Sequence, residues 1–199
     1  MAKDFEMHRS QGYVFGIGSR LGISVKMDFH DYQTRSCSAK ANLLSDKYGE
    51  EWPLDRVVKA LYFNPPGSPP DHFVGVITPE VDLPIDFGGL CSQVDALNGI
   101  PHSKYFPGSM PRGMSNGTCT PFPNDYLVDE KSRVGRIIAL LVCDYPRLDD
   151  QVVDISVGGN SPEARMASMH LPYSGIHRIL SERFPNTVFK VAPSYKDSA

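Results

Sequence analysis

The 199-residue chain lacks several features that would place it in a specialised class of protein. No apolar run approaches the roughly 18 residues of a transmembrane helix, and the opening residues hold no apolar segment typical of a secretory signal. The four cysteines are widely spaced and form no C-x-x-C pair, which argues against a disulfide framework. We therefore expect a cytoplasmic protein with free thiols and no membrane partner.

An excess of positive charge is also missing. The chain has 20 Lys and Arg residues against 23 Asp and Glu residues, so its formal net charge is −3. It thus lacks the overall basic character of a protein that binds nucleic acid unaided, although a local basic patch is still compatible with this charge. The six histidines lie far apart and have no metal-ligand spacing, so neither a metal nor another cofactor is expected.

Glycine and proline, by contrast, are abundant, with 17 of each. This content favours many loops and turns and argues against a helical bundle. A chain of this length buries about 70% of its extended surface, enough for a core without disulfides or metals. No repeat or linker divides the sequence, so we expect a single domain over residues 1–199.

Apolar periodicity predicts strands and helices in irregular alternation. The run 58–63, a Pro- and Gly-rich turn and the run 73–78 predict an antiparallel pair. Further strands are predicted at 137–143, 152–157 and 187–191, helices at 36–48, 86–98 and 171–184, and a long loop over 101–124. Because regular βαβ spacing is missing, a mixed α/β (α+β) domain is predicted.

A glycine-rich segment near the start, Gly16–Gly22, follows a short apolar run. Its G-x-G-x-x-x-G spacing differs from the dinucleotide-binding fingerprint, and no Rossmann unit follows it. We interpret it as an N-terminal turn.

Three features are candidates for chemistry, and each also has an ordinary structural explanation. Lys59 is a charge within an apolar strand, where alternation places it on the face opposite Val58 and Ala60; it is either a solvated lysine or a functional one. The loop 117–122 (G-T-C-T-P-F) can direct several backbone N–H groups into one cavity, or be a simple turn. The turn 158–162 (G-G-N-S-P) allows close backbone approach to a ligand, or merely ends a strand.

Together, in this order, these motifs resemble the YbaK/prolyl-tRNA-synthetase-associated editing domain family over residues 20–192. Lys59 in V-K-A-L-Y-F matches the family's strand lysine, and G-T-C-T-P-F matches its G-x-x-x-P loop. V-D-I-S-V-G-G-N-S-P matches the penultimate strand and turn, without the histidine-proline pair of the alanine-specific branch. The amino-acid specificity therefore stays open.

The resemblance implies a YbaK-like fold, in which a mixed, mainly antiparallel central sheet is flanked by helices. It also implies a metal-independent trans-editing deacylase, which hydrolyses the ester of a small amino acid mischarged onto tRNA, with tRNA for proline the favoured substrate. The residues assigned to catalysis are Lys59, Gly117, Thr118, Cys119, Thr120 and Pro121. Those assigned to substrate binding, on weaker grounds, are His30, Tyr32, Gly158, Gly159, Asn160 and Ser161.

Within this assignment, backbone N–H groups of the loop would hold the ester carbonyl, and Lys59 would grip a terminal phosphate or ribose. A thiol nucleophile at Cys119 is the less favoured mechanism, because no histidine is recognisably paired with it. Delivery of the tRNA by a partner, prolyl-tRNA synthetase being the family's precedent, fits the acidic chain. The alternative function is a catalytically silent module that binds aminoacyl-tRNA or a synthetase.

Overall fold

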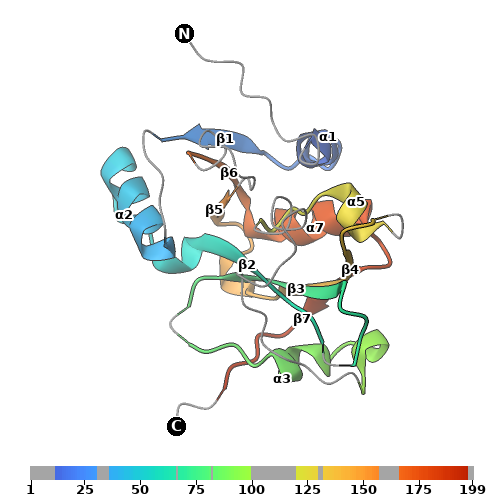
Figure 1. Cartoon of the computed structure of the whole chain (residues 1–199). Coiled ribbons are helices and arrows are strands. Elements are labelled where there is room, and N and C mark those ends of the chain that lie inside the picture. Colours follow the sequence, from blue (N-terminus) through green and yellow to red (C-terminus); the bar gives the residue numbers. More distant parts are fainter. Residues whose placement is uncertain are drawn as a thin grey trace.

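A seven-stranded sheet organises the molecule, with its strands in the order β1-β6-β5-β2-β3-β4-β7 (Figure 1). The computed structural model describes residues 12–30, 36–65, 67–81, 83–99, 120–129, 132–156 and 166–196. The strands are β1 (Lys26–Phe29), β2 (Val57–Phe63), β3 (His72–Pro79), β4 (Arg136–Cys143), β5 (Val152–Ser156), β6 (Ala167–Pro172) and β7 (Val188–Val191). The pairs β1–β6, β6–β5 and β2–β3 are antiparallel, and β5–β2, β3–β4 and β4–β7 are parallel. The predicted mixed α/β class is confirmed.

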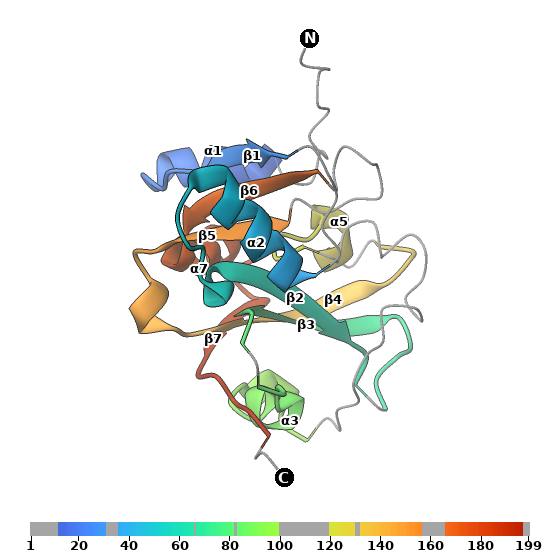
Figure 2. The ribbon, with the colours of Figure 1, turned by 90° about the vertical axis from the view of Figure 1, so that its left-hand side faces the viewer.

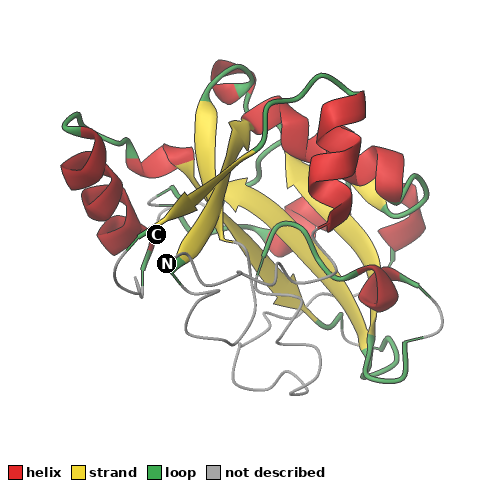
Figure 3. Ribbon diagram, turned by 90° about the horizontal axis from the view of Figure 1, so that it is seen from above, coloured by secondary structure: helices red, strands yellow, loops and turns green. Residues whose placement is uncertain are grey.

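Helices cover both faces of this sheet. Figure 2 shows α2 (Cys37–Tyr48) in front of β5 and β2, while α7 (Tyr173–Arg183) lies behind the strands. The helix α1 (Gly12–Arg20) packs against α7, and Figure 3 shows the strands between α2 and these helices. The shorter helices are α3 (Phe87–Cys91) and α5 (Asp125–Val128), and single 3-10 turns span Leu54–Arg56, Asp95–Leu97 and Pro146–Leu148.

The two faces of the sheet differ in chemistry, which positions the candidate site. Val58, Ile155 and Met169 lie in register across three neighbouring strands and belong to the main apolar core with α1 and α7. Residues one position away in each strand point to the opposite face, toward α2. A smaller apolar cluster, separate from the main core, joins α2 to that face.

Most of the predicted strands are confirmed, with small shifts at their ends. β2 and β3 form the predicted antiparallel pair, β4 and β5 follow the predicted runs, and β7 lies at an edge of the sheet. The helix predicted at 36–48 is also present as α2.

The single helix predicted at 86–98 is wrong. The helical spacing holds only over α3, because the chain leaves helical geometry at Val94, where φ is −118° and ψ is 111°, before a 3-10 turn. Gly89 permits a close approach here: a Cβ would lie 2.3 Å from both Asp86 Oδ2 and Ser194 Oγ. The C-terminal segment thus packs closely against α3.

Two other boundaries also differ from prediction. The last helix begins at Tyr173 rather than at Leu171, because Leu171 pairs with Val153 as part of β6. Gly16 lies in a helix, α1, rather than in a turn. Gly18 permits close packing there, since a Cβ would lie 2.8 Å from Val25. β1 and β6 were not predicted.

Candidate functional site

The helix α2 is held over the sheet by defined ends and a small apolar contact. Ser36 caps its first turn, its hydroxyl accepting a hydrogen bond from Ala39 N at 3.1 Å, and Gly49 ends it at φ 71°. Leu43 and Leu44 pack in the separate apolar cluster with Ala41, Trp52 and Val57. This part of the face beneath α2 is apolar.

The remainder of that face carries buried polar groups. Asp154 lies opposite His170, and Asp28 lies opposite Ser168, so the four side chains share the face toward α2. Asp154 is 1% exposed, and Asp28 and His170 are each 8% exposed. Buried charges persist in proteins only when they are paired or hydrogen-bonded, so their partners define this region.

His170 is the centre of one group of partners. Its Nε2 lies 3.0 Å from Asp154 Oδ1 and 3.8 Å from Asp28 Oδ2. The indole of Trp52 lies over the imidazole with ring centroids 5.3 Å apart, and Tyr48 stacks on Trp52 from α2. The carboxylates therefore hold the histidine from the sheet while aromatic rings shield it from solvent.

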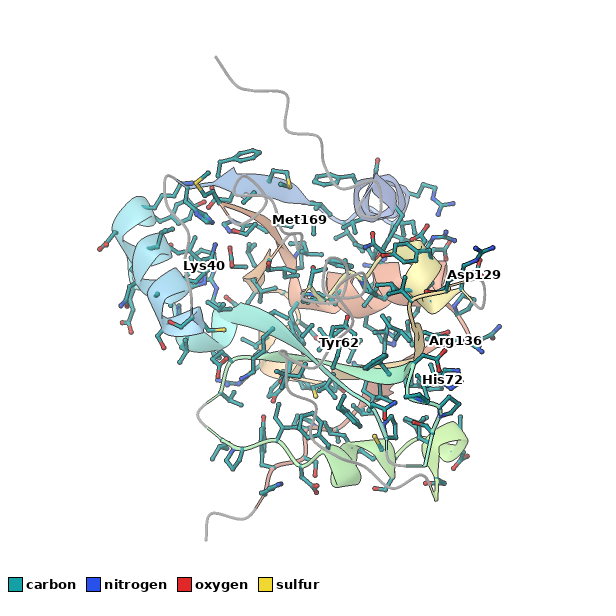
Figure 4. The ribbon with its side chains drawn as sticks, in the orientation of Figure 1. Lys40, Tyr62, His72, Asp129, Arg136 and Met169 are labelled. Atoms are coloured by element: carbon teal, nitrogen blue, oxygen red, sulfur yellow. The ribbon has the colours of Figure 1, made fainter. Side chains whose placement is uncertain are left out.

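Lys40 is the buried cation of α2 and is directed from the helix toward the sheet (Figure 4). Its Nζ is hydrogen-bonded to His30 Nε2 and lies 3.4 Å from Ser168 Oγ. Burial lowers the pKa of Lys40, and the nearby carboxylates of Asp154 and Asp28 oppose that shift. His30 was predicted as a substrate-binding residue; in the structure it supports α2 through Lys40.

Lys59, on β2, is partly buried and ion-paired. Its Nζ donates to Glu80 Oε1 at 2.7 Å, and the two side chains are only 25% and 22% exposed. Glu80 is fixed just beyond β3 because its backbone N–H donates to Val57 O at 2.8 Å. Lys59 is therefore paired and partly buried rather than freely solvated, and the ion pair alone assigns it no reaction.

Cys37, the first residue of α2, lies beside this pair. Burial, a hydrogen bond to Glu80 and the negative charge of Glu80 raise the pKa of the Cys37 thiol to about 12. The positive charge of Lys59 offsets only part of this shift. A thiol with such a pKa is almost wholly protonated at neutral pH and is a poor nucleophile. The chemistry available here is therefore that of the ion pair.

The described end of the long loop is anchored between β5 and β2. Thr120 is 1% exposed, and its hydroxyl donates to Ser156 O at 2.6 Å, at the end of β5. The hydroxyl of Tyr62, labelled in Figure 4, donates to Thr120 O at 3.1 Å. β5 pairs with β2 through Val57 and Val58. Ser156 and Lys59 are the next residues of the two strands, so the anchor of Thr120 lies at the level of Lys59.

The structure thus brings some of the predicted residues together. Lys59, Thr120 and the buried Pro121 all lie near the end of the β2–β5 pair, although Lys59 and Tyr62 leave opposite faces of β2. His30 lies apart from Lys59, against Lys40. The predicted residues outside the described part of the chain are Tyr32, Gly117, Thr118, Cys119, Gly158, Gly159, Asn160 and Ser161.

Sequence reasoning missed the polar groups beneath α2. Asp154 stands inside the apolar run V-V-D-I-S, the same signal that singled out Lys59, and could have been found in the same way. Lys40 and His170 gave no such signal, because each becomes buried only when α2 closes over β5 and β6. Among the described residues, no group of three or more His, Cys, Asp or Glu side chains is placed to hold a metal ion.

Comparisons with known proteins extend this picture only at the level of fold. No family model matches the chain, and no curated protein matches it. A solved structure, the crystal structure of hypothetical protein APE2540, is similar with a TM-score of 0.54 and 17% identity. The match covers 90% of this chain and 98% of that one. The chain is therefore a mixed α/β protein with a fold seen before, and at this identity the similarity shows the fold alone. In the described part of the chain, no helix is long and apolar enough to cross a membrane.

Proposed function

We propose that the protein is a trans-editing aminoacyl-tRNA deacylase of the YbaK type, acting in the cytoplasm on a small amino acid mischarged onto tRNA for proline. The observation that carries the proposal is the convergence of the motif-bearing segments. Thr120, at the end of the G-x-x-x-P loop, is hydrogen-bonded to Ser156, the last residue of the strand before the Gly-Gly turn, and that strand pairs with the strand of Lys59. Segments far apart in the sequence thus meet at one end of β2 and β5.

The proposed reaction is hydrolysis of an ester that is already activated. Water adds to the carbonyl carbon, the bond to the ribose oxygen breaks, and that oxygen receives a proton. The amino acid leaves as the carboxylate with release of a second proton. The protein must hold the carbonyl, position the water and exclude the correct amino acid, and none of these tasks requires a charged nucleophile.

Two features of the structure favour a mechanism without a protein nucleophile. The thiol of Cys37, beside Lys59, is held protonated by its raised pKa. Burial and hydrogen bonds fix Thr120, so the backbone is held in place at this residue, the described end of the loop. Backbone N–H donors held in this way stabilise an oxyanion by about two to three orders of magnitude in rate per donor.

Release of labelled alanine, serine or cysteine from mischarged tRNA for proline tests the proposal. We expect turnover of at least one of these esters, and loss of most of that turnover in Lys59→Ala. Lys190→Ala is the matched control, because Lys190 is also a strand lysine paired with a carboxylate, Asp144, at 2.9 Å. A circular-dichroism melt of each variant separates loss of activity from loss of fold.

The outcomes separate the two candidate functions. Equal rates for the wild type and Lys59→Ala would remove Lys59 from the mechanism. No turnover of any small amino acid would overturn the deacylase and leave the silent binding module, which equilibrium binding of aminoacyl-tRNA would then test.

A further inference from the structure

The ion pair of Lys59 has a consequence for the kind of group it can bind. A lysine that grips a phosphate works as an uncompensated positive charge. Here Glu80 Oε1 lies 2.7 Å from Lys59 Nζ, and both side chains are three-quarters buried. A phosphate brought to Lys59 would meet the carboxylate at almost the same distance, and the repulsion would cancel much of the attraction. The pair is therefore poorly suited to phosphate.

A second carboxylate, Asp154, lies close enough to act on the same surroundings. Burial is the main cause of the raised pKa of Cys37 beside the pair; Glu80 and Asp154 add to that shift, and Lys59 lowers the pKa by less than Glu80 raises it. A site of this character favours a group that carries both a positive charge and a hydrogen-bond acceptor. The aminoacyl end of the proposed substrate has both, as an α-ammonium beside an ester carbonyl.

We propose that Glu80 is a specificity-determining residue that accepts the α-ammonium of the aminoacyl group, while Lys59 donates to the adjacent ester carbonyl. This inference rests on the deacylase function and names its substrate class as esters of amino acids with a free, protonated α-amino group. N-acylated aminoacyl esters and α-hydroxy acid esters lack that charge and are discriminated against.

The geometry of the two partners matches. In an aminoacyl ester the α-nitrogen is attached to Cα and the carbonyl oxygen to the neighbouring carbonyl carbon. When both lie on the same side of the Cα–C bond, they are about 3 Å apart. The separation of Lys59 Nζ and Glu80 Oε1 is 2.7 Å. The Lys59 donor can therefore face the ester carbonyl while the Glu80 acceptor faces the α-ammonium beside it. A carboxylate has acceptor capacity for both cations at once.

The test compares three esters on the same tRNA for proline: alanyl, N-acetylalanyl and lactyl. The lactyl ester replaces the ammonium by a hydroxyl of similar size, so it separates charge from bulk. We expect the wild type to hydrolyse the alanyl ester about 10- to 100-fold faster, in kcat/KM, than the lactyl ester, as expected for loss of one charged hydrogen bond. N-acetylalanyl ester is expected to be at least as poor a substrate.

Glu80→Gln keeps the size of the side chain and removes its charge, so we expect the alanyl-to-lactyl preference to fall to within about threefold. Glu80→Asp retains the charge and is expected to restore part of the preference. The matched control is Glu182→Gln, which removes an exposed carboxylate paired with Arg20 at 3.4 Å on α7 and leaves the preference unchanged.

Each result has a distinct meaning. If the wild type hydrolyses none of the three esters, the deacylase function fails and the inference fails with it. If it hydrolyses alanyl and lactyl esters at equal rates, the function stands and the inference is overturned. A full preference in Glu80→Gln would equally remove Glu80 from recognition. Should Glu80→Gln fail to fold, the wild-type comparison and Glu80→Asp still decide.

Discussion

At the scale of single residues, the protein buries ionisable side chains between a helix and the sheet, where apolar side chains are usual. Lys40 is the clearest case, because it lies within a helix yet is 8% exposed and contacts His30 rather than solvent. Removing an ammonium group from water is costly, and the lowered pKa of Lys40 expresses that cost. The same residue thus yields a prediction about stability and pH.

The free energy of unfolding should depend on pH through Lys40. Its pKa in the folded protein lies below the ordinary value of 10.5, so the unfolded chain binds more protons in the window between the two values. Stability therefore rises with pH through that window. We expect the wild type to gain stability relative to Lys40→Met as the pH rises toward 10.5, measured by urea denaturation.

Lys190 provides the matched control for this experiment. Its hydrogen bond to Asp144 raises its pKa, so in the folded protein it stays protonated throughout the same window. The difference between the wild type and Lys190→Met should therefore stay flat up to about pH 10, the ordinary pKa of lysine. A flat difference for Lys40→Met as well would show that burial leaves its ammonium unperturbed.

The sequence predicted those site residues that stand out within one segment and missed those that are placed by contacts between segments. Lys59 was found because a charge inside a single apolar strand is visible locally, and its position near Thr120 follows from the pairing of β2 with β5. Its partner Glu80 was missed, because the backbone hydrogen bond that fixes Glu80 joins β3 to Val57 across a hairpin. The sequence predicted the pairing of 58–63 with 73–78 but set no register for it, so the position of Glu80 beside Val57 did not follow.

At the scale of elements, α2 is the part of the fold on which the candidate site depends. It contributes Cys37 and Lys40 to the polar face, and its apolar contact with the sheet is a small cluster. A helix with so little apolar contact relies more than usual on its caps. Its N-terminal cap is therefore a sensitive point.

Ser36→Ala should destabilise the protein by about 1 kcal/mol, because it removes the acceptor for Ala39 N. Ser38→Ala, at an exposed position of the same helix, is the control and should be close to neutral or slightly stabilising. Thermal denaturation of the two variants gives the comparison. Equal melting temperatures would mean that the cap does not hold α2.

Elements defined by local chemistry were predicted well, and those defined by tertiary contact were not. The Pro- and Gly-rich turn between β2 and β3 was enough to predict their antiparallel pairing. β1 and β6 were missed because the mixed sequence K-M-D-F and the short A-S-M-H-L-P gain their strand geometry from pairing with each other and with β5. The helical spacing that continues past α3 was overridden at Val94.

Two glycines differ in their surroundings, one tightly packed and one in open space, and they give a paired test. Gly75 on β3 permits close packing: a Cβ would lie 2.6 Å from Tyr62 and 2.8 Å from Leu140, so Gly75→Ala should destabilise by about 1–3 kcal/mol. Gly16 on α1 has open space around it, so Gly16→Ala should stabilise by up to about 1 kcal/mol. Denaturation midpoints of the two variants should therefore move in opposite directions.

At the scale of the whole molecule, several of the cations are paired with carboxylates. Among the described residues, Arg20, Arg147 and Arg183 each lie within 4 Å of a carboxylate, as does Lys190. Affinity for a nucleic acid comes largely from cations that displace counterions, and a cation beside a carboxylate does this poorly. This arrangement supports the proposal that tRNA reaches the protein through a partner such as prolyl-tRNA synthetase.

The salt dependence of tRNA binding tests that proposal. We expect the protein alone to bind weakly, with a slope of log K against log salt concentration shallower than about −3, because several of its cations already lie beside carboxylates. In Asp125→Asn with Glu182→Gln, Arg183 and Arg20 lose their carboxylates, so the slope should steepen by about 1–2. Filter binding between about 50 and 200 mM salt measures both slopes. Tight binding by the wild type alone at the higher salt concentration would overturn delivery by a partner, because the protein would then supply the phosphate contacts itself.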